Sequence, residues 1–427
     1  MFEIRGNSYE FEKICKLLGS TVSVVSILLI AGIINNTPVR AAENDSSLTS
    51  VNKATTSAAV LVSEGKDYSI PVNKSFEDKG IKIEIKDITA SKNEIKVKTL
   101  IHRNGTLNKI DHINNMVEFV VQNAEHDVSY DMEESKIDDE TREYTFKISN
   151  LKDFKDNLDL RYDVILPEYD FNGWVNASVD ASKYYDKSLE KSLNFEMENY
   201  DFYKLESSVI GTNLLYKEKN QDADDENING LSNLILKFKN RMYLLDDSYI
   251  NSYNREEDYA VGGFSTDVIK YDDLKDADDY SVIPLEYTIK ESEARDYYKN
   301  STDEDIDYKN TDNVKYEYEF NFDDGTTADV YKVVRDGEKV KLYYNAESFE
   351  KAMLVGVALN GYYDFNKDDY EHYNKVNKVI YKDLEKDNGY VIEFNKVAKN
   401  KPFIIESDKL LLEHSHDFKV CDEIKLK

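Results

Sequence analysis

Two histidines near the C-terminal end of the chain have the spacing of metal ligands. His414 and His416 are two residues apart, so on a β-strand both side chains would project from the same face. Imidazole nitrogens are common ligands of zinc, which takes four ligands in structural sites. His372 and Glu413 would complete a site only if the fold brought them there. A surface histidine pair is therefore the favoured interpretation, and a zinc site is the alternative.

A second candidate site has the chemistry of calcium binding. Asp364, Asn366 and Asp368 resemble the opening of a calcium loop, in which carboxylate and amide oxygens at alternate positions converge on a hard cation. The remainder of that pattern differs, because Asp369 replaces the turn glycine and Lys375 replaces the bidentate glutamate. The first three residues are the predicted metal ligands, for weakly bound calcium, and no other cofactor is expected.

No motif in the sequence identifies a reaction. The chain lacks a P-loop, a G-x-G-x-x-G turn, an H-E-x-x-H pair and a C-x-x-C pair. The stretch Gly262-Gly-Phe-Ser265-Thr lacks the glycine that a nucleophile elbow needs two residues after the serine. With 84 acidic residues, no pair of carboxylates stands out for glycoside hydrolysis. We therefore predict no catalytic residues. The alternative is a secreted or envelope hydrolase with an unrecognised carboxylate site.

The charge of the chain argues against nucleic acid as a partner. Its 427 residues carry a formal net charge of −29, and affinity for nucleic acid depends on lysine and arginine neutralising phosphates. The two cysteines, Cys15 and Cys421, lie at opposite ends of the sequence. No disulfide framework is expected from them, and domains of this size are stable without one.

The N-terminal 41 residues predict export. Leu17 to Ile34 is an uncharged, mostly apolar run that follows Lys13 and Lys16, as the positive-inside rule requires when the C-terminal side is translocated. Val39-Arg40-Ala41 offers small residues for cleavage of a signal peptide. An uncleaved anchor is the alternative, because 18 helical residues span about 27 Å, close to the hydrocarbon thickness of a bilayer. Either way the rest of the chain is extracytoplasmic, secreted or anchored to the cell membrane.

The remainder predicts an all-β fold. Apolar and polar residues alternate with the period of a half-buried strand, as in Ile81, Ile83 and Ile85, and units of about 110 residues favour tandem immunoglobulin-like β-sandwich domains. The expected organisation is a signal peptide or membrane anchor at 1–41, a flexible spacer at 42–66, three sandwiches at 67–190, 195–290 and 314–427, and an acidic linker at 291–313.

Three local expectations follow from the same patterns. Asp336-Gly337 and Asn388-Gly389 predict hairpin turns, since such turns need positive φ at their central positions. Ser207–Tyr216 predicts one strand of the second sandwich. The single tryptophan, Trp174, is expected to pack in the core of the first sandwich instead of forming a ligand platform, because large aromatic residues on strands are usually buried.

Two stretches of the first predicted sandwich resemble a known family. They are Tyr68-Ser-Ile-Pro-Val-Asn-Lys-Ser-Phe-Glu-Asp-Lys-Gly-Ile-Lys-Ile-Glu-Ile and Ala90-Ser-Lys-Asn-Glu-Ile-Lys-Val-Lys, together with Gly173-Trp174. They are similar to uncharacterised extracytoplasmic immunoglobulin-like domains of clostridial and bacillar single-pass and anti-sigma-factor-like proteins. The resemblance covers residues 67–180. It implies the fold and an envelope location, and it brings no catalytic residues.

These observations together favour a non-catalytic sensor or interaction module of a Gram-positive cell envelope. Its expected partner is an envelope protein or a cell-wall ligand of unknown identity, and the membrane itself if the N-terminal segment is uncleaved. Loops at the ends of sandwiches are where such modules commonly bind.

The N-terminal segment gives the first testable prediction. We expect the exported protein to begin at Ala42, because the helix-breaking residues and the small residues before that position occur in the order that signal peptidase requires. Intact-mass measurement of the exported protein checks this. A mass that retains residues 1–41, with the protein in the membrane fraction, would show an uncleaved anchor.

Overall fold

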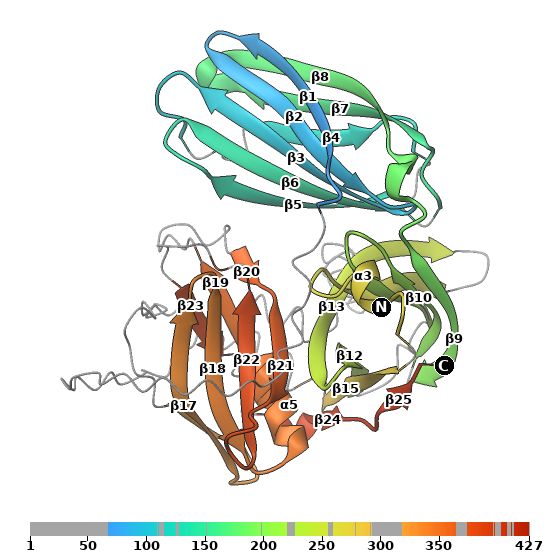
Figure 1. Cartoon of the computed structure of the whole chain (residues 1–427), viewed down its shortest axis with the longest axis vertical. Coiled ribbons are helices and arrows are strands. Elements are labelled where there is room, and N and C mark those ends of the chain that lie inside the picture. The colour runs from blue at the N-terminus through green and yellow to red at the C-terminus, as the bar shows by residue number, and fades with distance from the viewer. Residues whose placement is uncertain are drawn as a thin grey trace, which may run out of the picture.

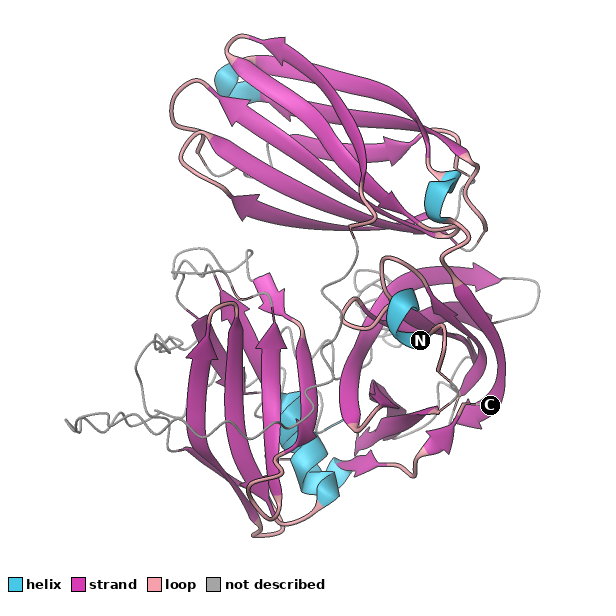
Figure 2. Cartoon of the chain, in the orientation of Figure 1, coloured by secondary structure: helices cyan, strands magenta, loops and turns pink. Residues whose placement is uncertain are grey.

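The computed structural model shows a chain built almost entirely of antiparallel strands (Figures 1 and 2). It describes residues 67–426 except 109, 111–114, 125–127, 151, 198, 220–226, 255–258, 278, 291, 293–317, 364–373, 396, 398–402, 408–410 and 412–413. The predicted all-β class is confirmed. The N-terminal segment and the spacer, residues 1–66, lie outside the described residues. Among the helices of the described ranges, none has the length and apolarity needed to cross a membrane.

The first unit consists of two sheets that share one core. Apolar residues at alternate positions of each strand point inward, as the period-two pattern predicted. The larger sheet has the order β1-β2-β3-β6-β5 and the smaller one β4-β7-β8. The strands are β1 (Ile70–Asp78), β2 (Ile81–Ala90), β3 (Glu94–Arg103), β4 (Met116–Val121), β5 (Val128–Lys136), β6 (Thr141–Asn150), β7 (Asn157–Leu166) and β8 (Phe171–Asp180), with short 3-10 helices η1 (Pro167–Tyr169) and η2 (Ser182–Tyr184).

The second unit is a curved sheet with the order β15-β12-β13-β14-β11-β10-β9 (Figure 1). It encloses a core of its own, to which the short helix α3 (Tyr271–Leu274) contributes Leu274. The strands are β9 (Leu189–Met197), β10 (Tyr200–Ser207), β11 (Thr212–Lys219), β12 (Asn227–Phe238), β13 (Arg241–Asn254), β14 (Tyr259–Thr266) and β15 (Tyr280–Lys290). Residues 207–216 are therefore not one strand: Ser208 to Gly211 turn the chain from β10 into β11, and the Ser208 amide donates to the Gly211 carbonyl at 2.8 Å.

The third unit continues the same sheet. Pairing of β13 with β21 joins the second unit to the order β21-β22-β18-β17-β16, and a separate sheet has the order β20-β19-β23. Its elements are β16 (Tyr318–Asn321), β17 (Thr327–Asp336), β18 (Lys339–Ala346), α5 (Phe349–Ala358), β19 (Leu359–Tyr363), β20 (Asn374–Val376), β21 (Lys378–Lys382), β22 (Gly389–Asn395), β23 (Phe403–Ser407), η3 (Ser415–Asp417), β24 (Phe418–Val420) and β25 (Ile424–Lys425).

Three strands of the second unit are buried on both faces. In β12, Leu234 and Leu236 belong to the core of the second unit, whereas Ile235 belongs to the core of the third. The strands β13 and β15 divide their apolar residues in the same way. Such strands carry continuous apolar runs instead of alternation. The two C-terminal strands, β24 and β25, also return to pair with β15. The predicted sandwiches at 195–290 and 314–427 thus share strands and one continuous sheet.

The helix α5 was not predicted from the sequence. Ser348 caps it by accepting a hydrogen bond from the Lys351 amide at 3.2 Å, which satisfies one of the free N–H groups of the first turn. Residues 352–358 are all buried, and the Tyr344 hydroxyl donates to the Ala352 carbonyl at 2.7 Å. Packing on the third core therefore stabilises a short helix whose β-branched residues would suit a strand.

The hairpin turns partly follow the prediction. Between β17 and β18 the turn residues are Gly337 and Glu338, because Asp336 still pairs with Lys339; Gly337 has φ +62°. Asn388 has φ +56° at the start of β22. Two two-residue turns have positive φ at both positions: Lys79-Gly80 joins β1 to β2, and Lys239-Asn240, which carries no glycine, joins β12 to β13.

One buried carboxylate lies at the junction between the second and third units and faces cations from both. Glu393 of β22 is 4% exposed; it accepts a hydrogen bond from the Tyr381 hydroxyl at 3.0 Å. The ammonium groups of Lys339 and Lys341 lie 3.6 and 3.5 Å away, and the guanidinium of Arg241 from β13 lies at 3.9 Å. Burial by itself would raise the pKa of Glu393, but the Tyr381 hydrogen bond and these cations lower it overall.

We expect Glu393→Gln to lower the free energy of unfolding by about 1–3 kcal/mol at neutral pH, because it removes a charge that partly buried cations face. The lowered pKa means that this stabilisation is present above the ordinary range of glutamate, about 4.3, and is lost as the pH falls through the folded-state value. Denaturant titrations at several pH values measure it.

Lys339→Met is the matched control. The Lys339 side chain is half exposed, so its loss should cost under about 1 kcal/mol. A Glu393→Gln effect of the same size at pH 7 and pH 3 would contradict the electrostatic origin.

Candidate functional site

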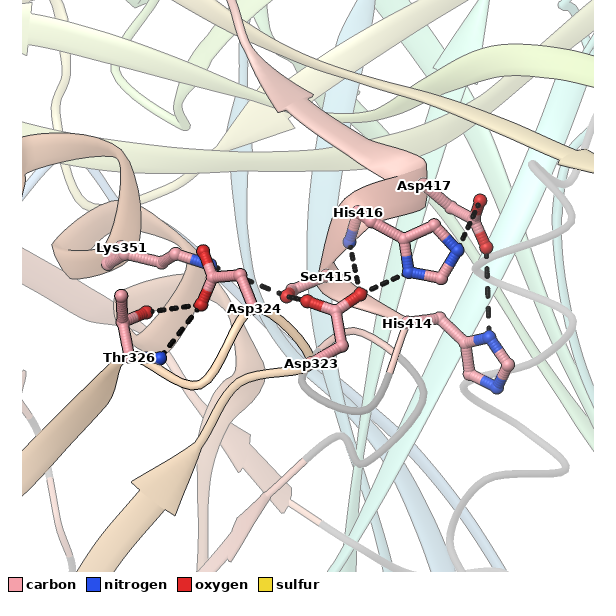
Figure 3. Close-up of polar contacts among 8 residues, drawn as sticks. All are labelled: Asp323, Asp324, Thr326, Lys351, His414, Ser415, His416 and Asp417. Atoms are coloured by element: carbon pink, nitrogen blue, oxygen red, sulfur yellow. Dashed lines mark hydrogen bonds and ion pairs between the residues drawn. The ribbon is translucent and has the colours of Figure 1, made fainter.

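The predicted histidine pair lies on a turn, not on a strand. His414 precedes η3 and His416 lies within it, so the two rings do not project in parallel from one sheet face. Their centroids are 6.2 Å apart. The turn that follows β16 lies against η3 and places Asp323 next to it (Figure 3). Sequence spacing alone did not indicate this contact.

Asp323 holds η3 against the turn that follows β16. Its carboxylate accepts hydrogen bonds from the Ser415 hydroxyl and from the His416 amide, the latter at 3.0 Å, and it contacts the Nδ1 atom of His416 (Figure 3). Burial would raise the pKa of Asp323, but the hydrogen bonds from Ser415 and His416 lower it below its usual value. Asp417 lies between the two imidazoles, 3.3 Å from His416 Nε2 and 3.7 Å from His414 Nδ1.

A second carboxylate extends this cluster to helix α5. Asp324 pairs with the Lys351 ammonium at 2.8 Å and accepts hydrogen bonds from the amide and hydroxyl of Thr326 (Figure 3). Lys351 also lies 4.2 Å from the centre of the Phe322 ring, in a cation–π contact. The Lys351 and Thr326 hydrogen bonds hold the pKa of Asp324 well below its usual value.

The geometry of this cluster differs from that of an activated nucleophile. In a catalytic triad the serine hydroxyl gives its proton to histidine, and the carboxylate contacts the far side of the ring. Here Ser415 and His416 both contact Asp323, so the carboxylate separates the hydroxyl from the base. In the described parts of the chain, no set of three His, Cys, Asp or Glu side chains could hold a metal ion. These contacts hold the C-terminal segment against the β16–β17 turn.

The predicted calcium ligands Asp364, Asn366 and Asp368 lie outside the described residues, and so does His372. The side chain of Glu413 is likewise not described. The weak calcium site therefore stays a prediction.

The prediction for Trp174 was wrong: its side chain is 51% exposed. In β8 the buried residues are Phe171, Gly173, Val175 and Ala177, so Trp174 falls on the opposite, outward face. The inward position before it is a glycine because the Phe76 ring of β1 packs there; a Cβ on Gly173 would come within 2.6 Å of that ring. The alternation of apolar and polar residues along β8 is the sequence signal that predicts an outward-facing indole.

The indole lies on the edge strand β8 of a polar sheet face, next to the central strand β7. The register of β4, β7 and β8 sets Glu118, Asp163 and Trp174 in one row across the three strands. Asn172 and Asn176 flank Trp174 along β8, and both are exposed. We call the outward residues of these three strands the Trp174 face: Met116, Glu118, Val120, Asn157, Asp159, Arg161, Asp163, Ile165, Asn172, Trp174, Asn176, Ser178 and Asp180.

Arg161 lies on the central strand β7 of this face and contacts both Asp163 and Trp174. Its guanidinium Nε and one terminal nitrogen donate to the two carboxylate oxygens of Asp163 at 2.7 and 2.8 Å, and its Cζ atom lies 5.5 Å from the centre of the Trp174 ring. The Asp163 hydrogen bond raises the pKa of Arg161 further. A bidentate pair of this kind fixes both side chains, so the indole has a charged and ordered neighbour.

Comparisons with known proteins give no family assignment. No family model matches the chain, and no curated protein matches it. A solved structure, described as the conserved domain protein from Bacillus anthracis, shares 15% sequence identity with a TM-score of 0.42; the match covers 53% of this chain and 81% of that one. This likeness is too distant to support an argument about function.

The exposure of the single tryptophan is directly measurable. We expect the fluorescence of the folded chain to show the emission of a water-exposed indole, with acrylamide quenching that approaches that of the urea-unfolded chain, because about half of the side chain contacts solvent. With excitation at the red edge of the indole absorption band, where the 32 tyrosines absorb little, the emission comes from Trp174, the only tryptophan in the sequence. A blue-shifted spectrum that resists acrylamide would show that the indole is buried.

Proposed function

We propose that this chain is a non-catalytic binding protein of a Gram-positive cell envelope, and that the Trp174 face binds a cell-wall glycan. The observation that carries the proposal is the half-exposed indole on the edge strand of a polar sheet face, beside the paired side chains of Arg161 and Asp163. Exposed tryptophan is rare on strands and loses little conformational entropy on binding, so it is suited to contact a ligand. Export by the N-terminal segment would bring this face to the cell wall.

The residue types of the face suit a sugar chain. The C–H groups on one side of a pyranose ring can stack on the indole, while its hydroxyls can hydrogen-bond to the amides of Asn172 and Asn176 and to the carboxylate of Glu118. The face carries four carboxylates against the single cation Arg161. That charge disfavours phosphate-rich polymers, including nucleic acid and teichoic acid, and favours a neutral or amino-bearing glycan.

We also propose that the first unit is an immunoglobulin-like sandwich. Two antiparallel sheets around one core, with alternating inward residues, support this assignment. The hydrolase alternative has weaker support, because the histidine and serine of the C-terminal cluster share one carboxylate and lack the contact between nucleophile and base.

Binding to purified peptidoglycan stripped of teichoic acid tests the proposal. Trp174→Ala should weaken binding about 10-fold or more, as expected for a central aromatic contact. Leu384→Ala is the matched control: it shortens a side chain that is 88% exposed in the third unit, and it should bind like the wild-type chain. Equal binding by wild type and Trp174→Ala would reject the Trp174 face as the binding surface.

A further inference from the structure

The third core contains a buried lysine beside a buried asparagine. Lys378, the first residue of β21, is 4% exposed, and Asn360 of β19 is 6% exposed. The Lys378 ammonium donates to the Asn360 Oδ1 atom at 3.1 Å and to the carbonyls of Val357 and Leu359, both at 2.6 Å. These carbonyls lie at the C-terminal end of α5, so the lysine also caps the helix. The amine is therefore held at one position relative to the carboxamide.

Apolar groups surround this pair. Gly361 follows Asn360, and a Cβ there would lie within 2.8 Å of both Phe403 and Phe394, so the two rings pack directly against β19. Val357 and Ile380 are also buried in this core. A charged amine and an amide are thus enclosed where water is largely excluded, a setting in which two held groups have a high effective concentration.

We infer that Lys378 and Asn360 become joined by an isopeptide bond. The Lys378 nitrogen, after losing a proton, attacks the Cγ atom of Asn360. The Nζ–Cγ bond forms, the Cγ–Nδ2 bond breaks, and the Nδ2 nitrogen leaves as ammonia. One ammonium and one primary amide thereby become one secondary amide and one ammonium ion, so atoms and charge balance. No oxidant, reductant or cofactor takes part.

The contacts favour this step geometrically. The Asn360 Oδ1 atom lies 3.1 Å from the lysine nitrogen and is bonded to Cγ. A small rotation of the carboxamide would therefore bring Cγ, the carbon under attack, within reach of that nitrogen. A proton must pass from Nζ to the leaving nitrogen.

Such a bond would supply a covalent link that the cysteines do not. It would join β19, in the sheet β20-β19-β23, to β21, in the continuous sheet of the second and third units. The bond would close the chain segment from 360 to 378, which would reduce the conformational freedom of the unfolded chain as a disulfide does. This inference is independent of glycan binding.

Mass spectrometry of the full chain under denaturing conditions tests the link. The wild-type chain should be lighter than its sequence by the mass of one ammonia, after any signal-peptide cleavage is taken into account. A proteolytic digest should contain one branched peptide that unites the segments of Asn360 and Lys378. Asn360→Ala and Lys378→Met should both have the masses of their sequences.

A succinimide at Asn360-Gly361 would also lose ammonia, so a second treatment separates the two products. Hydroxylamine cleaves a succinimide and leaves an isopeptide bond intact, and the branched peptide should therefore survive it. A wild-type chain at the mass of its sequence, or a digest without the branched peptide, overturns the inference. The wild-type measurement decides the question even where a variant fails to fold.

Discussion

The strands β12, β13 and β15 are buried on both faces, and the organisation of the second and third units depends on this. Leu234 and Leu236 contribute to one core and Ile235 to the other, so neither core is complete without the same strand. Each apolar side chain that leaves water stabilises the fold by about 1.5–3 kcal/mol. Two units that share so many such residues should unfold together, in contrast to sandwiches joined only by a linker.

Sharing strands in this way explains the positions of the C-terminal elements. Once β15 has an open edge, β24 and β25 can pair with it, and the chain must run from the third unit back to the second. The contacts of Asp323 fix the segment just before β24, and Glu393 of β22 neutralises cations beside the pairing of β13 with β21. In each case a carboxylate with a lowered pKa holds segments that are distant in sequence.

The first unit has a different relation to the rest. Its contacts with the second unit are largely polar: Asn93 donates to Glu206, Asn213 donates to Glu94 at 3.5 Å, and the Tyr68 hydroxyl donates to Asp272 at 2.5 Å. It shares no strand with its neighbours and keeps a sheet face open to solvent. A ligand on the Trp174 face would therefore leave the shared cores of the other units undisturbed. The proposed binding face and the shared cores thus lie in different parts of the chain.

The sequence by itself determined the all-β class and most strand positions, because a half-buried strand needs side chains that alternate between core and water. The runs beginning at Ile81, Ile95 and Tyr144 all lie in strands with that alternation. The same rule applied to β8 would have placed Trp174 outside, but the usual burial of tryptophan outweighed the alternation in the prediction. At Trp174 the alternating pattern predicts the correct orientation of the side chain, and the usual burial of tryptophan predicts the wrong one.

Only the tertiary structure decided which strands share a core and which polar side chains meet. Burial of both faces of β12 depends on strands of the third unit that are distant in sequence, and no local period encodes it. The contacts of Asp323 with His416 and of Lys378 with Asn360 join residues from separate elements. Charged and amide side chains are common along this chain, so spacing could not select these pairs. Strand order and register brought them together, since both arise from the packing of the whole chain.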